Sequence, residues 1–161
     1  MLVAIAIGMI VMGSMATMMS YTGRSFAALV NYLELDRKSR NALDVMTRDI
    51  RQTTQLSSFA TNRLVFTDWD AMSLTYAYDG VAKTLTKTKG STNTVLLTEC
   101  DALTFSIFQR NPIGGTYDQY STATVTNAKL VQVTWTCSRQ ILASKVNTES
   151  VQTAKIVIRK Q

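Results

Sequence analysis

The first 23 residues of this chain contain no charged side chain, and the first charge is Arg24. From Met1 to Met19 the sequence is almost wholly apolar. An apolar run of 18 or more residues is long enough to cross the roughly 30 Å hydrocarbon core of a bilayer as a helix. Residues 1–23 are therefore predicted to form a membrane-spanning helix near the start of the chain.

Two other interpretations of this segment fit less well. A cleaved secretory signal has a basic start, a shorter apolar stretch and a small-x-small cleavage site; Ser14-Met15-Ala16 matches such a site, but the basic start is missing and apolar residues continue past it. A core helix of a soluble protein has a polar face, and none precedes Ser20. Because Arg24 follows the span and no Lys or Arg precedes it, the positive-inside rule taken literally would place the C-terminal side in the cytoplasm.

The helix is expected to continue beyond the apolar segment through residues 24–56, with its exit beginning at residues 55–58. No proline precedes Pro112, and no glycine lies between Gly23 and Gly80. Three acid-before-base pairs four residues apart support an exposed helix face: Glu34–Lys38, Asp36–Arg40 and Asp44–Arg48. Residues at steps of three and four form one stripe, which we expect to pack on the protein's own sheet: Leu35, Ser39, Ala42, Leu43, Met46, Ile50 and Thr53.

The remaining residues, 57–161, are predicted to form an antiparallel β domain of six or seven strands. Apolar residues alternate with polar ones near residues 64–66, 74–78, 83–88, 94–98, 103–108, 131–137 and 154–158, a period typical of strands. Asp79-Gly80 and the segment 89–93 carry turn signals, whereas residues 110–127 and 139–149 are expected to be loops. Hairpin spacing without βαβ units predicts the α+β class, a long helix packed on an antiparallel sheet.

Composition excludes some chemistry and leaves other options open. The net charge of +6 is spread along the chain, so it permits anionic partners without selecting one. The absence of histidine excludes His-based acid–base catalysis and His-ligated metals. Asp68-Trp69-Asp70 is the nearest approach to a paired-carboxylate site, and such a cluster is usually a solvated turn; we therefore expect no enzyme, cofactor or metal. DNA capture would use Lys83, Lys87, Lys89, Arg110 and Lys129, although scattered surface charge is the more common explanation for such residues.

Cys100 and Cys137 are the only two cysteines. An even number of cysteines in an exported domain is typical of a disulfide, and closing a 38-residue loop would stabilise the fold by ~4 kcal/mol in the chain-entropy model. The alternative is a pair of buried free thiols acting as small hydrophobic side chains. A bridge requires Cα atoms within ~7 Å, so both readings stay open at this point.

Several stretches together resemble one bacterial family. The opening MLVAIAIGMIV looks like the segment that directly follows a prepilin processing motif, and residues 40–52 (RNALDVMTRDIRQ) resemble the ALDxxxRDLRQ stretch of PilW-type minor pilins and J-type minor pseudopilins of type II secretion. Residues 74–80, 96–99 and 156–159 also fit that group. The chain is thus similar to type IV pilin-like proteins over nearly its whole length, with a moderately specific match in the helix and a loose one in the sheet.

The sequence departs from the family pattern at its start. The basic leader, the Gly-Phe processing site and the Glu four residues on are absent, so Met1 would align just after that Glu and no site of cleavage or N-terminal methylation can be named. We expect the true N-terminus to lie upstream. If a basic leader precedes Met1, its positive charge would lie in the cytoplasm, which would explain why Arg24 alone places the C-terminal side there under the positive-inside rule.

The resemblance implies a structural or initiating subunit of a type IV pilus or type II secretion pseudopilus. It implies an inner-membrane, single-pass protein with a periplasmic or extracellular β domain, whose partners are other subunits and the inner-membrane assembly platform. The same helix would leave the membrane and pack in the filament core through Leu2, Val3, Ala4, Ile5, Ile7, Gly8, Ile10, Val11, Gly13, Ala16 and Ser20. The alternative function is a membrane-anchored β domain with a binding role, including DNA uptake, that forms no filament.

Overall fold

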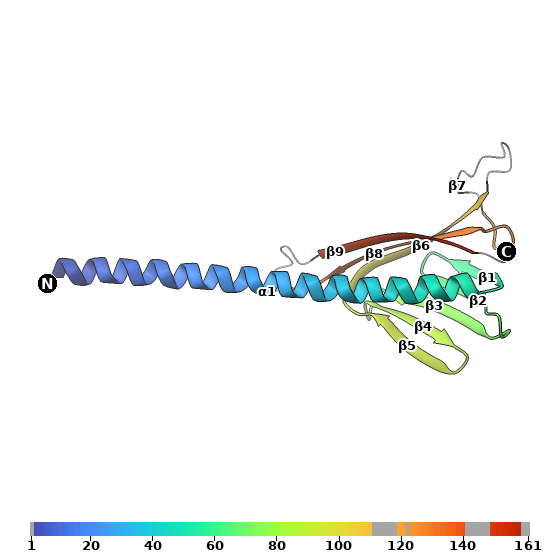
Figure 1. The fold of residues 1–161 in the computed structure, drawn as a ribbon, viewed down its shortest axis with the longest axis horizontal. Helices are drawn as coiled ribbons and strands as arrows, with labels where there is room; N and C mark the ends of the chain where they lie inside the picture. The colour runs from blue at the N-terminus through green and yellow to red at the C-terminus, as the bar shows by residue number, and fades with distance from the viewer. Residues whose placement is uncertain (1, 111–118, 122, 141–148, 159–161) are drawn as a thin grey trace.

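The computed structural model describes residues 2–110, 119–121, 123–140 and 149–158. One helix, α1 (Leu2–Gln52), is followed by strands only in these ranges. The 51 residues of α1 give it a length of about 77 Å at 1.5 Å per residue. Its N-terminal half projects away from the rest of the molecule, and its C-terminal half lies along the β domain (Figure 1). This α+β arrangement confirms the fold class predicted from the sequence.

Helix α1 ends at Gln52, earlier than the predicted residue 56. Thr53 donates its hydroxyl to the carbonyl oxygen of Ile50 at 2.7 Å, and Thr54 donates both its backbone N–H and its hydroxyl to the carbonyl oxygen of Thr67, at 2.9 and 2.8 Å. Thr53 and Thr54 are both β-branched, and β-branched residues have a lower helix propensity than straight-chain residues. The chain therefore leaves the helix at Thr53 and joins a sheet directly.

The strands form two antiparallel sheets rather than the single sheet expected. The first is a meander in the order β1-β2-β3-β4-β5, and the second has the order β7-β6-β8-β9. The strands of the first sheet are β1 (Gln55–Ala60), β2 (Arg63–Thr67), β3 (Ser73–Asp79), β4 (Thr84–Lys89) and β5 (Thr92–Leu97). Those of the second are β6 (Cys100–Arg110), β7 (Gln119–Tyr120), β8 (Leu130–Ser138) and β9 (Glu149–Val157).

Seven of these strands coincide with the segments predicted from alternation, and two were missed. β1 lies where the helix exit was expected, and β7 lies within the predicted loop 110–127. The rest of that loop at 111–118 and 122, and most of the predicted loop 139–149 at 141–148, lie outside the described residues. Between β4 and β5 a two-residue turn places Gly90 at a φ of 56°, which glycine adopts without steric cost.

The core lies where the C-terminal half of α1 meets both sheets. Helix α1 contacts β9 of the second sheet and β5 of the first. Trp135, Tyr76, Phe66 and Phe105 are the largest buried side chains. From the helix, Leu35, Ser39, Ala42, Met46, Ile50 and Thr53 are buried, and Leu43 is partly buried against them. On the closing strand, Ile156 and the following Ile158 are buried and Ala154 is partly buried.

Candidate functional site

The projecting half of α1 is an apolar surface that no other described part of the chain covers. Every side chain described from Val3 to Phe26 is exposed, although the segment is long and apolar enough to cross a membrane. Monomeric soluble proteins rarely expose a contiguous apolar patch of this size. The predicted packing residues Val3, Ala4, Ile5, Ile7, Gly8, Ile10, Val11, Gly13, Ala16 and Ser20 all lie on this segment. Leu2 begins the helix, and its side chain is outside the described set.

The glycines of this segment have no packing role within the chain. A Cβ placed on Gly8, Gly13 or Gly23 would meet no other atom within 4 Å. Glycine inside a helix costs about 1 kcal/mol relative to alanine. No contact among the described residues offsets that cost. The absence of side chains at these positions would instead let the backbone of a second helix approach closely.

A second apolar stripe continues beyond the uncharged segment. Phe26, Leu29, Val30 and Leu33 are between 46% and 68% exposed, and their spacing places them on one helix face. At 3.6 residues per turn this face is opposite the buried stripe of Leu35, Ala42 and Ile50. Arg24 falls on the side of the buried stripe, so the first charge of the chain does not interrupt the exposed apolar face.

Sequence reasoning missed this second stripe. The residues 26–33 have the i, i+3, i+4, i+7 pattern that defines a helix face. The sequence therefore carries the signal, but the prediction for residues 24–56 is one amphipathic helix with a single apolar stripe that packs on the sheet. Only the burial of the opposite face shows that these four residues stay exposed among the residues that the structure describes.

A polar cluster holds α1 where it leaves the β domain. Arg139, which follows β8, binds both carboxylate oxygens of Glu99 at 2.9 and 2.7 Å. The same guanidinium donates to Glu34 at 2.9 Å and to Asn31 at 3.1 Å, both on α1. The ion pairs with Arg139 and Lys38 lower the pKa of Glu34 to about 2, and the Arg139 guanidinium also lowers the pKa of Glu99. We call Asn31, Glu34, Glu99 and Arg139 the neck cluster.

Further contacts along the exposed helix face support the same attachment. The predicted pairs Glu34–Lys38 and Asp36–Arg40 form at 3.0 and 2.8 Å, and Asp36 also accepts a hydrogen bond from Gln152 of β9 at 3.0 Å. Asp44 and Arg48, both described, form no such ion pair. The helix is therefore tied to the second sheet by side chains as well as by its buried stripe.

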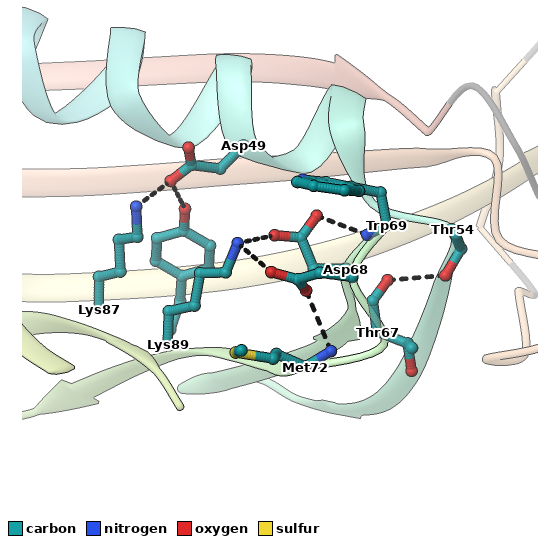
Figure 2. Close-up of polar contacts among 10 residues, drawn as sticks. Asp49, Thr54, Thr67, Asp68, Trp69, Met72, Lys87 and Lys89 are labelled. Carbon is teal, nitrogen blue, oxygen red and sulfur yellow. Dashed lines mark hydrogen bonds and ion pairs between the residues drawn. The ribbon is translucent and has the colours of Figure 1, made fainter. Parts of the chain in front are cut away.

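A second polar cluster holds the far end of α1 to the first sheet (Figure 2). Asp49 accepts hydrogen bonds from Lys87 of β4 at 2.5 Å and from the Tyr76 hydroxyl of β3 at 2.9 Å. Tyr76 is completely buried, and burial next to the Asp49 carboxylate raises the pKa of its hydroxyl. We call Asp49, Tyr76 and Lys87 the distal cluster. The neck and distal clusters therefore hold α1 to the β domain at both ends of the segment from Asn31 to Asp49.

The Asp68-Trp69-Asp70 segment forms a turn rather than a pair of free carboxylates. Lys89 binds Asp68 at 2.5 Å and Asp70 at 2.9 Å, which raises the pKa of Lys89. The remaining oxygens accept backbone hydrogen bonds: Asp68 from the N–H of Trp69 and Asp70 from that of Met72 (Figure 2). Both carboxylates are therefore engaged in shaping the β2–β3 connection.

The basic residues considered for DNA binding are largely paired within the protein. Lys83 binds Asp101 at 2.7 Å, Lys87 belongs to the distal cluster, and Lys89 binds the two aspartates of the β2–β3 turn. Arg110 ends β6 and Lys129 precedes β8. Three of the five charges are thus matched by carboxylates of the same chain. Among the described residues, no group of three Cys, Asp or Glu side chains is placed to hold a metal ion.

Cys100 and Cys137 lie directly opposite each other on β6 and β8. Both are buried, and their thiols are unbridged in this structure. A hydrogen bond between the two side chains, together with burial, raises the pKa of Cys100, and the same hydrogen bond lowers the pKa of Cys137.

No protein family model matches the chain, and no curated protein is significantly similar to it.

Proposed function

We propose that this chain is a filament subunit of the type IV pilin class, either a minor pilin or a J-type minor pseudopilin. In this proposal α1 stores the protein in the inner membrane, with the β domain outside the cytoplasm. The helix later leaves the lipid and packs against equivalent helices in the filament core. The role is structural, and we assign the chain no catalytic activity.

The exposed stripe of Phe26, Leu29, Val30 and Leu33 is the observation that carries the proposal. The apolar face that runs from Val3 to Leu33 is about 45 Å long at 1.5 Å per residue. A bilayer core covers only about 30 Å of it. Moving the span toward the domain would bury Arg24, at a cost of about 2.5 kcal/mol or more near the bilayer centre. A membrane therefore covers the first part of this face and leaves the stripe in water.

A simple membrane anchor gives no reason for that remaining stripe. A helix that packs in a filament does, because neighbouring helices can cover apolar residues at any height. The glycines support the same proposal, since Gly8 and Gly13 would let a second helix approach closely. The neck and distal clusters also fit it, because a filament subunit must present its domain at a constant angle to its core helix.

The test is photo-cross-linking from within the stripe in the native host. A photoreactive amino acid replaces Leu29, and a matched variant carries it at Val81, which is 96% exposed on a turn of the β domain. We expect the Leu29 variant to form adducts with the apolar helix of other filament subunits, identified by mass spectrometry, and the Val81 variant to form none there. Adducts to phospholipid alone would contradict the proposal and would favour a membrane-anchored β domain that forms no filament.

A further inference from the structure

We infer that Cys100 and Cys137 form a disulfide bond, which links β6 to β8 once the domain is outside the cytoplasm. The location rests on the proposed function, whereas the ability to form the bond rests on the geometry of the two strands. The sequence alone left the bridge and the free thiols as equal alternatives.

The two cysteines occupy a position where cross-strand side chains approach closely. Cys100 pairs with Cys137 in the β6–β8 register, and the N–H of Ser138 donates to the carbonyl oxygen of Glu99 at 3.1 Å. That bond joins residues just outside the pair, so Cys100 and Cys137 form a non-hydrogen-bonded pair. Such pairs have Cα atoms about 4.5 Å apart, which lies within the range of about 4.4–6.8 Å found for disulfides.

Local irregularity gives this end of the ladder room to adjust. The register between β6 and β8 shifts between Cys100 and Ala102, which is a β-bulge that places two residues of β6 opposite one residue of β8. The backbone around Cys100 is held from other directions: its N–H donates to the carbonyl of Lys83 at 3.0 Å, and its carbonyl accepts from the Tyr78 hydroxyl at 2.9 Å. These contacts fix the backbone of Cys100 opposite Cys137 in the β6–β8 register.

Helix α1 covers the pair. Both cysteines are fully buried, as are Ser39 and Ala42 of the helix. Ser39 accepts a hydrogen bond from the indole N–H of Trp135 at 3.3 Å, and Trp135 lies two residues before Cys137 on the same face of β8. The bond must therefore form before α1 docks on the domain or while it is transiently detached, and a docked helix then shields it from reductants.

The oxidation is an ordinary thiol–disulfide exchange. The Cys137 thiolate attacks a sulfur of an external disulfide, supplied by a protein or a small molecule, and one thiolate of that oxidant leaves. The Cys100 thiolate then attacks the Cys137 sulfur, which forms the internal bond and releases the second thiolate. Two protons leave the cysteines, and the two electrons reduce the oxidant to its dithiol form.

The first experiment measures the state of the thiols in cells. Full-length protein in native membranes is trapped in acid, denatured and treated with a maleimide–polyethylene glycol reagent before or after reduction. We expect no added mass before reduction and two additions after it. Two additions before reduction would show that the bond is absent in cells.

The second experiment separates the site from the location. Denatured, reduced full-length protein is refolded in detergent with oxidised and reduced glutathione, and Cys100→Ser and Cys137→Ser variants serve as controls. Formation of the internal bond in the wild type alone supports the site, and failure to form it overturns the site. A bond that forms in vitro but is absent in cells would instead contradict the proposed location and with it the proposed function.

The third experiment tests the covering by α1. Oxidised folded protein is incubated with dithiothreitol beside the same protein in denaturant. We expect reduction to be at least tenfold slower in the folded protein. Equal rates would contradict a bond buried beneath the helix.

Discussion

The distal cluster predicts a specific loss of stability when Asp49 is replaced. Asp49→Ala removes two hydrogen bonds to a carboxylate, from Lys87 and from the buried Tyr76 hydroxyl. Hydrogen bonds to charged groups contribute about 1.5–3 kcal/mol each. The Lys87 side chain is 22% exposed, which reduces its share, so we expect a loss of about 3 kcal/mol in the free energy of unfolding. That corresponds to a fall of roughly 10 °C in the melting temperature of a domain of this size.

The assay is thermal unfolding of the detergent-solubilised full-length chain, followed by near-ultraviolet circular dichroism. Tyr76→Phe should lose about 1.5 kcal/mol, and the double variant should lose less than the sum of the single variants, because both changes remove the same hydrogen bond. Asp44→Ala is the matched control, since this exposed helical aspartate forms no ion pair in the structure. A change below about 0.5 kcal/mol for Asp49→Ala, the range of ordinary surface substitutions, would refute the reasoning.

Three further predictions concern the core, the neck cluster and the projecting helix. Phe105→Ala removes a buried ring and should cost about 3–5 kcal/mol in chemical denaturation, whereas Val81→Ala should change stability by less than about 0.5 kcal/mol. The pKa of Glu34 is about 2 in the folded protein, against an ordinary value of 4.5. Ionised Glu34 therefore stabilises the fold fully above pH 4.5, and this stabilisation is lost as the pH falls toward 2. Melting temperatures should decline over that pH window, and they should decline less in the Arg139→Gln variant. Gly8→Ala should not lower the melting temperature, because alanine favours a helix by about 1 kcal/mol over glycine and its Cβ meets no atom within 4 Å, but it should lower co-isolation with filament subunits.

Periodicity was enough to predict the elements that obey one rule along their length. The 3.6-residue stripe from Leu35 to Thr53 identified the helix face that is buried, and alternation identified the strands β2 to β6, β8 and β9. These signals are local, because each depends on which side of one element faces the core.

Apart from the exposed stripe at residues 26–33, whose pattern is local, the features that were missed depend on contacts between distant residues. β1 forms because Thr54 bonds to Thr67 across the first hairpin, which no helical pattern discloses. The neck cluster joins Glu34 to Arg139, 105 residues apart, and the division into two sheets is likewise set by strand pairing. The opposition of Cys100 and Cys137 became visible only with the register of β6 and β8.

Co-isolation of this chain with other filament subunits tests the central claim most directly. Leu29→Glu places a charge in the exposed stripe, and Val81→Glu places the same charge on a turn that the proposal leaves in water. Both sites are exposed in the single chain, so both variants should fold and reach the membrane equally. We predict at least a tenfold loss of co-isolated subunits for Leu29→Glu, equivalent to about 1.4 kcal/mol, and no loss for Val81→Glu. Equal recovery from the two variants would contradict the assignment of this stripe to packing between subunits.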